Sequence, residues 1–345
     1  MSGRSDTDLF YTDKSASLLA DMPSYVKQYI RSIHNRTSPR TRYEYLKDIG
    51  SFLDYVKTTQ HLKNVMLDDL KKYEKSDFET YFEYLEHYTK SGKERTNSRT
   101  SIKRKMSSLR KFFAYLFEND MIDSDKIRKI EMPKLHHKEI IRLENDEAVD
   151  FLNAVEYGNN LTKKQNDYHK LQSVRDSAII HLMLSTGIRV SECAELDLAD
   201  IDLKKCSIRI VRKGGNEATV YFSDEALTYI QAYIEIRKDI KNCDTDALFL
   251  SSRKTRLSVR AIEALVKKYA SRSVPTKHIT PHKLRSTFAT NLYNETGDIY
   301  LVAETLGHKD VTTTKEHYAN LSDKRKAENR NKVTFRKRND DDDDK

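Results

Sequence analysis

Glycine and cysteine are scarce in this chain of 345 residues, which has nine glycines and three cysteines. No GxxxxGK[ST] or GxGxxG pattern occurs among the glycines, so ATP or dinucleotide chemistry has no obvious binding loop. The cysteines, Cys193, Cys206 and Cys243, are odd in number and widely spaced. They indicate reduced thiols in a cytosolic protein, with no disulfide framework and no zinc site.

Long apolar runs are absent as well. The chain has no stretch of about 18 apolar residues, the length that would suggest a membrane span. Its N-terminus, MSGRSDTDLFYTDK, lacks the apolar segment of a secretion signal. We therefore expect a cytoplasmic protein that neither spans a membrane nor leaves through one.

Charge is abundant instead. The chain has 62 Lys and Arg residues against 53 Asp and Glu, a net charge of +9, and its isoelectric point is about 9.1. This excess favours a polyanionic partner, nucleic acid before acidic lipid. At about 100–200 residues per domain, the length suggests two domains.

The first predicted domain, residues 22–130, has only helical patterns, and the polar residues 1–21 before it are expected to be flexible. Ser38 provides an N-cap for one of the helices. We expect a compact all-helical unit. Apolar residues recur at helical spacing in four stretches, 22–33, 38–56, 77–88 and 99–119.

The second predicted domain, residues 144–335, mixes element types and follows a linker at 131–143, which is charged and contains a proline. Residues 173–196 predict a helix, a break and a helix, and residues 206–222 alternate on both sides of Gly214–Gly215 as a β-hairpin does. The predicted fold class is mainly α with a small antiparallel β-sheet. Further helix signals are a Ser258 cap, Thr280 followed by Pro281, a stop at Gly307 and a last, mostly charged helix at 322–335.

A charged tail, 336–345, ends the chain. Its sequence NDDDDDK differs sharply from the FRKR just before it. Asp-Asp-Asp-Asp-Lys is also a protease-cleavage tag, so an engineered end and a natural acidic tail both fit.

A basic arm lies in the first domain. Between Lys90 and Lys111 nine cations face a single acid, Glu94. A solubilising surface would mix both signs, whereas here the apolar stripe of the same helix leaves the cations on one exposed side. We predict contacts with the phosphate backbone, which set position rather than sequence specificity. The nine are Lys90, Lys93, Arg95, Arg99, Lys103, Arg104, Lys105, Arg110 and Lys111.

Reactive side chains gather in the second domain. Arg189 sits at a helix break in an apolar neighbourhood, where an arginine should be paired or used, with Glu192 one turn on. His282 and Arg285 are three residues apart and share an exposed helix face. Lys213 ends a strand just before the glycine turn. The stretch LGHKDVTTTKEHY adds His308 and Tyr318. Taken singly, each has an ordinary explanation as a surface residue.

Together these groups suit the transfer of a phosphodiester. Two arginines can clamp non-bridging oxygens in a bidentate geometry. A tyrosine can act as a nucleophile when cations lower its pKa from about 10, and a mobile lysine can protonate the leaving 5′ oxygen. A covalent intermediate conserves the bond energy, so no metal, cofactor or nucleotide is required.

The series TGIRVSE, RKGG, TPHKLRSTFATNLY and LGHKDVTTTKEHY resembles the tyrosine recombinase (phage integrase) family, from about Met22 to Phe335. The resemblance implies that Arg189 and Arg285 clamp the phosphate and that Lys213 is the general acid. It further implies active-site imidazoles at His282 and His308, a 3′-phosphotyrosine on Tyr318, and Glu192 as support for the first arginine. The two domains would form a C-shaped clamp around duplex DNA.

The sequence leaves the subgroup open. Length, MPSYVKQYIRSI and TRYEYLKD resemble Xer recombinases, which resolve chromosome dimers, and about twenty residues before the first helix leave no room for an arm-binding domain. Tyr318, however, lies ten residues after His308, one more than is typical of Xer proteins and as in many mobile-element integrases. A catalytically silent DNA-binding protein on the same fold and a type IB-like topoisomerase would also fit the sequence.

The expected partners are duplex DNA with paired inverted half-sites in the nucleoid, and further copies of the chain. In the family, the C-terminal segment packs on a neighbour and closes a tetramer on two duplexes. Val333 and Phe335, in the otherwise charged KVTFRKR, suit such docking. The target sequence, the directionality and any accessory protein are not given by the sequence.

Overall fold

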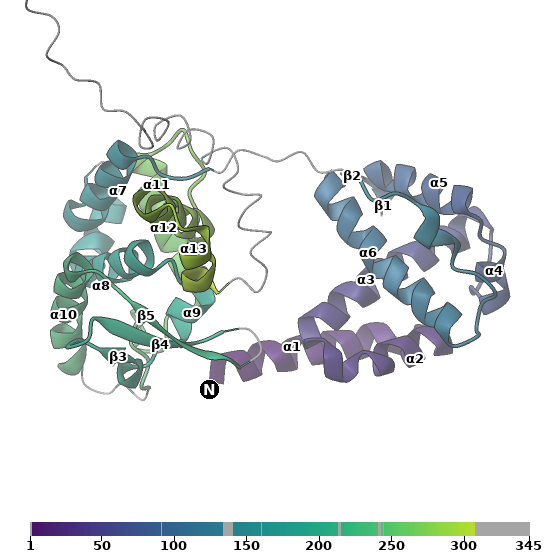
Figure 1. Cartoon of the computed structure of the whole chain (residues 1–345), viewed down its shortest axis with the longest axis horizontal. Helices are drawn as coiled ribbons and strands as arrows, with labels where there is room; N and C mark the ends of the chain where they lie inside the picture. The colour runs from purple at the N-terminus through teal and green to yellow at the C-terminus, as the bar shows by residue number, and fades with distance from the viewer. Residues whose placement is uncertain are drawn as a thin grey trace, which may run out of the picture. The chain divides into compact units, whose positions relative to one another are not determined.

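The computed structural model describes residues 2–90, 92–133, 141–159, 161–212, 215–240, 243 and 245–307. The chain divides into two compact units, Met1–His136 and His137–Lys345, which carry the purple-to-blue and the teal-to-yellow elements of Figure 1. The division falls inside the predicted linker, 131–143.

The N-terminal unit is a bundle of helices around an aromatic core. The ring of Phe52, on the third helix, lies 5.1 Å from that of Tyr81 and 5.8 Å from that of Phe113, so one residue joins three helices. The elements are α1 (Ser2–Ala20), α2 (Ser24–Ser32), η1 (His34–Arg36), α3 (Pro39–Thr59), α4 (Leu67–Lys71), α5 (Lys75–Glu86), β1 (His87–Lys90), β2 (Lys93–Thr96), α6 (Arg99–Glu118) and η2 (Lys126–Lys129).

Two expectations for this unit are wrong. The segment 1–21, expected to be flexible, forms helix α1, whose Tyr11 ring lies 5.5 Å from that of Tyr43 on α3. The unit is also not all-helical, because β1 and β2 pair as an antiparallel hairpin. Both strands are polar, so no apolar alternation marks them in the sequence; the turn uses Gly92 at φ 71°.

The C-terminal unit contains a three-stranded sheet and helices that pack around α8, whose residues 176–183 are buried. Its elements are α7 (Asn145–Tyr157), α8 (Lys163–Thr186), α9 (Val190–Glu195), η3 (Leu198–Asp200), β3 (Ile201–Asp202), β4 (Ser207–Val211), β5 (Glu217–Tyr221), α10 (Asp224–Lys238), α11 (Val259–Ser273), α12 (Pro281–Thr296) and α13 (Ile299–Leu306).

The predicted hairpin is confirmed as β4 and β5, with Ile208 opposite Val220. β3 adds a short third strand that was not predicted. Ile208 and Ile210 are buried, while Arg209 between them is exposed, as alternation on a one-sided sheet requires. Helices α7, α10 and α12 pack against α8. The fold is therefore mainly α with small antiparallel sheets, as predicted.

Candidate active site

A glycine ends α8 and sets the start of α9. Gly187 has a φ of 62°, and a Cβ there would lie 2.4 Å from Cδ1 of Phe288 on α12, so both backbone and packing require glycine. Its N–H donates to the carbonyl of Met183 at 3.0 Å and closes the helix. The chain turns here, and Arg189 becomes the N-cap of α9.

Glu192 holds Arg189 from two sides. The carboxylate accepts the backbone N–H of Arg189 on Oε2 and its Nη1 on Oε1, both at 2.8 Å. The Glu192 side chain is 5% exposed and that of Arg189 39%. The pairing predicted for Arg189 is therefore present, and it fixes a guanidinium that is still open to solvent on one side.

Arg285 joins the ends of two helices. Its Nη1 donates to the carbonyl of Gly187 at 2.6 Å and its Nη2 to that of Leu306 at 2.5 Å. These carbonyls close α8 and α13, where the helix dipole places partial negative charge that a cation stabilises. Arg285 is only 6% exposed, which corrects the expectation of an exposed face shared with His282. The Arg285 guanidinium thus contacts Gly187, the residue at which the chain turns two positions before Arg189.

A third guanidinium, that of Arg212, also contacts the C-terminal end of α13. Arg212, the residue directly after β4, donates from Nη1 to the carbonyl of Glu304 at 3.2 Å and from Nη2 to that of Thr305 at 2.6 Å. Burial lowers the pKa of Arg212 from its ordinary value; Glu192 acts against this shift and Arg189 adds to it. Arg212 was not among the predicted site residues, because nothing in RKGG shows that it reaches a helix end 92 residues later.

His282 lies exposed in the first turn of α12, after Pro281 at the first helical position. The predicted Lys213, His308 and Tyr318 lie outside the described residues, but the residues directly before Lys213 and His308 lie inside them. Arg212 directly precedes Lys213, and Gly307, the C-cap of α13, directly precedes His308.

Four of the described charged groups therefore meet where α8 and α13 end: Arg189, Glu192, Arg212 and Arg285. Three guanidiniums against one carboxylate give a local excess of positive charge. Buried partners fix the Arg189 and Arg285 guanidiniums before any ligand binds. Donors fixed in this way can stabilise the charge of a phosphate under attack strongly.

Within the described ranges, no cluster of three or more His, Cys, Asp or Glu side chains could hold a metal ion.

Comparison with known proteins agrees with this arrangement. The phage integrase family pattern matches residues 141–325, and the N-terminal SAM-like domain of phage integrases matches residues 26–119. The chain is 33% identical to the tyrosine recombinase XerS of Streptococcus agalactiae serotype III (strain NEM316), over 91% of this chain and 96% of that protein. The chain belongs to the phage integrase family.

Within that family it is a tyrosine recombinase of the Xer type, a site-specific enzyme that cleaves and rejoins DNA. Its fold matches the crystal structure of the XerH recombinase bound to its difH substrate before cleavage, with a TM-score of 0.63, 19% identity and coverage of 92% of this chain and 88% of that one. A lambda integrase tetramer bound to a Holliday junction matches with a TM-score of 0.59 and 17% identity, over 84% and 77% of the two chains. The longer spacing from His308 to Tyr318 thus does not separate this recombinase from the Xer group.

The basic arm of the recombinase has two parts in the structure. Lys93 and Arg95 lie on β2 and Arg99 opens α6, and all three are exposed. Lys93 and Arg95 are two apart on a strand and so share a face. Arg99 occupies a first helical turn that has no acidic residue, a position where a cation does not stabilise the helix. All three cations are therefore open to solvent, and Arg99 is not placed to stabilise its own helix.

The second part of the arm makes polar contacts within the unit. Asp48 of α3, whose side chain is 1% exposed, accepts from Nη1 and Nη2 of Arg104 at 2.5 and 2.8 Å. It also accepts from Lys105 Nζ at 3.3 Å and from Ser108 Oγ at 2.7 Å, and Lys111 donates to the Tyr45 hydroxyl at 2.9 Å. The expectation that all nine cations form one exposed side is thus wrong for Lys105, whose side chain is only 13% exposed, whereas Arg104 pairs with the same buried carboxylate and stays 46% exposed.

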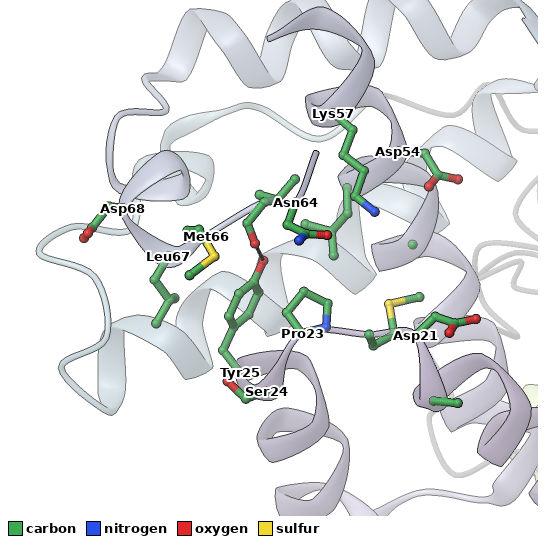
Figure 2. A pocket seen from close by; sticks show the side chains of 15 residues that line it. Asp21, Pro23, Ser24, Tyr25, Asp54, Lys57, Asn64, Met66, Leu67 and Asp68 are labelled. Atoms are coloured by element: carbon green, nitrogen blue, oxygen red, sulfur yellow. Dashed lines mark hydrogen bonds between the residues drawn. The ribbon is translucent and has the colours of Figure 1, made fainter. Parts of the chain in front are cut away.

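A pocket of about 540 Å³ also lies in the N-terminal unit, between the start of α2, the middle of α3 and residues 64–68. Figure 2 shows Tyr25 pointing its hydroxyl to the Val65 carbonyl, at 2.9 Å, within this pocket. None of the predicted catalytic or DNA-contacting residues lines it.

Over the described part of the chain, no helix is both long and apolar enough to cross a membrane.

Proposed function

We propose that the recombinase cleaves DNA by attack of the Tyr318 oxygen on a phosphodiester clamped by Arg189 and Arg285. The phosphorus–oxygen bond to Tyr318 forms as the bond to the 5′ oxygen breaks, and Lys213 gives that oxygen its proton. The 5′ hydroxyl of a partner strand then attacks the 3′-phosphotyrosine and releases Tyr318. The observation that carries the proposal is the meeting of Arg285 and the Arg189–Glu192 pair at Gly187.

The imidazoles have supporting roles in this proposal. His282 and His308 hydrogen-bond the phosphate, and Glu192 keeps the Arg189 guanidinium oriented. Each guanidinium offers donors in a planar fork that matches two phosphate oxygens. Because the phosphotyrosine bond preserves the energy of the broken phosphodiester, rejoining needs no nucleotide.

The biological role that fits best is resolution of chromosome dimers in the nucleoid, for which the 33% identity to XerS over 91% of the chain is the support. The test is to trap covalent protein–DNA complexes in cells and sequence the attached DNA, with Tyr318→Phe as the non-covalent background. We expect one chromosomal site near the replication terminus. Reads that instead map to the ends of a mobile element would make the protein an integrase.

DNA binding is proposed to use the exposed part of the basic arm. If about six to eight phosphates are contacted, the logarithm of the binding constant should fall with the logarithm of salt concentration with a slope of roughly −5 to −7. Lys93→Gln, Arg95→Gln and Arg99→Gln together should make the slope less negative by about 2–3. Fluorescence anisotropy at several salt concentrations measures it.

A matched control removes three other exposed lysines of the same unit, Lys63, Lys72 and Lys75, and should change the slope by less than about one phosphate contact. Equal slopes for both triple variants would show that the arm does not contact DNA. Arg104 and Lys105 are left intact, because removing the partners of buried Asp48 is expected to destabilise the unit by about 3–5 kcal/mol and so confuse the result.

The assembly proposed is a tetramer on two duplexes, with inverted half-sites and the segment after Tyr318 docked on a neighbouring protomer. Its support is the fold shared with a recombinase that forms a tetramer on a Holliday junction, together with the apolar pair Val333 and Phe335 in a charged segment.

A further inference from the structure

The side chain of Arg212 spans from the β4–β5 hairpin to the C-terminal end of α13. Its two terminal nitrogens donate to consecutive carbonyls, those of Glu304 and Thr305, at 3.2 and 2.6 Å. Arg285 takes the next carbonyl, that of Leu306, at 2.5 Å. The last turn of a helix has carbonyls without partners inside the helix, and here two arginines from different elements supply them.

The backbone around this contact is fitted to it. Gly307 has a φ of 65°, and a Cβ at this position would lie 2.1 Å from Nη1 and 2.5 Å from Cζ of Arg212. A side chain of any size would therefore displace the guanidinium. Only glycine provides both the left-handed backbone and the space.

Arg212 is also held at its own backbone. Its N–H donates to the carbonyl of Asn216 at 2.8 Å, and its carbonyl accepts from the N–H of Gly215 at 3.1 Å. The residue is thus fixed in the hairpin turn at one end and on α13 at the other. Lys213 directly follows Arg212 in the sequence, and His308 directly follows Gly307, so the contact joins the two described segments that lead into these residues.

Two other roles fit these contacts less well. As a third phosphate clamp, Arg212 would need a ligand to explain its placement, but its reach to the Glu304 and Thr305 carbonyls and the space that Gly307 leaves for it involve α13 alone. As a cap for α13 alone, it would not need to come from the residue next to Lys213, since Arg285 already reaches the same turn.

We propose that Arg212 is a positioning residue, whose contact with the Glu304 and Thr305 carbonyls couples the hairpin carrying the general acid to the helix that leads into His308. The proposal rests on the roles proposed above for Lys213 and His308. It predicts that loss of Arg212 impairs mainly the protonation of the leaving 5′ oxygen, while the nucleophile and the clamping arginines still work.

The test compares two substrates in single-turnover cleavage by the full chain: a nicked duplex with an ordinary 5′ oxygen at the scissile bond, and the same duplex with a 5′-phosphorothiolate, whose sulfur leaves without a proton. General acid catalysis is typically worth about 10²–10⁴ in rate. Arg212→Ala should lose about tenfold or more of this on oxygen, and cleave the sulfur substrate at nearly the unchanged rate. Lys213→Ala should show the same pattern, with a larger defect on oxygen.

Arg209→Ala is the matched control. Arg209 lies exposed on β4, the strand that leads to Arg212, and pairs with Asp200 at 2.9 Å, so its loss should leave both rates unchanged. Arg212→Lys keeps the charge but can reach one carbonyl at a time, and should give an intermediate ratio of the two rates. A thermal melt tests whether Arg212→Ala folds, and Arg212→Lys replaces it in the comparison if it does not.

The outcomes separate the inference from the function on which it rests. If Lys213→Ala is rescued by sulfur but the Arg212 variants are slowed equally on both substrates, or not at all, Arg212 is a structural cap or unused, and only this inference fails. If Lys213→Ala is not rescued, the general-acid assignment fails and the Arg212 inference fails with it. Sulfur-selective rescue of both positions supports the coupling.

Discussion

Tyr318→Phe is expected to bind DNA as tightly as the unchanged recombinase and to form no covalent complex with it. The substitution removes only the oxygen that would attack phosphorus, whereas the positive charge of the site and of the basic arm is untouched. Incubation with a nicked suicide substrate, followed by denaturing electrophoresis, should show complete loss of the shifted protein–DNA band. A native gel with the same duplex should show unchanged binding.

The choice of control follows from the structure. Tyr293 and Tyr300 are the nearest tyrosines before Tyr318 in the sequence, and they differ in accessibility: Tyr293 is 9% exposed, in an apolar cluster with Val302 and Leu306, whereas Tyr300 is 62% exposed. Tyr300→Phe should therefore cleave normally and is the matched control. A shifted band that persists in Tyr318→Phe would reassign the nucleophile, and Tyr300 would be tested first because it is accessible.

Helix boundaries in this chain were predictable where a side chain or a glycine acts locally. The Ser38 and Ser258 hydroxyls accept backbone N–H groups of Thr41 and Ala261, and Gly307 ends α13 in the left-handed region, as predicted. Thr280 takes the N-cap position of α12 without a side-chain cap bond. Such signals need only neighbours within four residues, so the sequence contains them.

Elements without a strong apolar stripe were missed. Helix α1 is mostly polar, and β1 and β2 have no alternation of apolar residues. Contacts with neighbouring elements, and not a local sequence pattern, therefore account for α1 and for the β1–β2 hairpin.

Helices α7 and α10 were also not predicted individually, although capping interactions start both of them: the Glu144 N–H donates to the Glu147 carboxylate, and the Ser223 hydroxyl accepts the Ala226 N–H. These two helices were therefore predictable from local signals.

The contacts of the candidate site and the basic arm likewise divide into local ones, which the sequence predicts, and long-range ones, which it does not. The Arg189–Glu192 pair spans three residues and follows from helix geometry. The contacts of Arg285 with Gly187 and of Arg104 with Asp48 span 98 and 56 residues. No periodicity encodes such distances, so the burial of Arg285 and the pairing of Arg104 with buried Asp48 could be learned only from the packed structure.

Cutting the chain after Leu321 is expected to leave single half-site binding intact and to abolish strand exchange. The described C-terminal unit already has a closed core: its two apolar clusters contain residues from Leu143 to Leu306. The truncation removes none of these side chains and none of the predicted catalytic residues, so the shortened protein should fold, bind and cleave.

What the truncation removes is the proposed contact in trans. Val333 and Phe335 would dock on a neighbour, and a head-to-tail contact of this kind closes into a ring when the rotation permits, as in a cyclic tetramer. Couplings between binding sites are typically about 1–3 kcal/mol, a 5- to 150-fold change in affinity. Without the segment, the second half-site of a full site should fill as if the first were empty.

Gel-shift titrations on duplexes with one and with two half-sites measure this coupling, and a paired-site recombination assay measures strand exchange. Val333→Ser with Phe335→Ser, in the full chain, is the sharper variant, because it keeps the charges of the segment and removes only its apolar contacts. It should behave as the truncation does, whereas Lys337→Gln should not. Cooperative filling of both half-sites by the truncated protein would contradict docking in trans and place the protomer–protomer contact on the surface that remains.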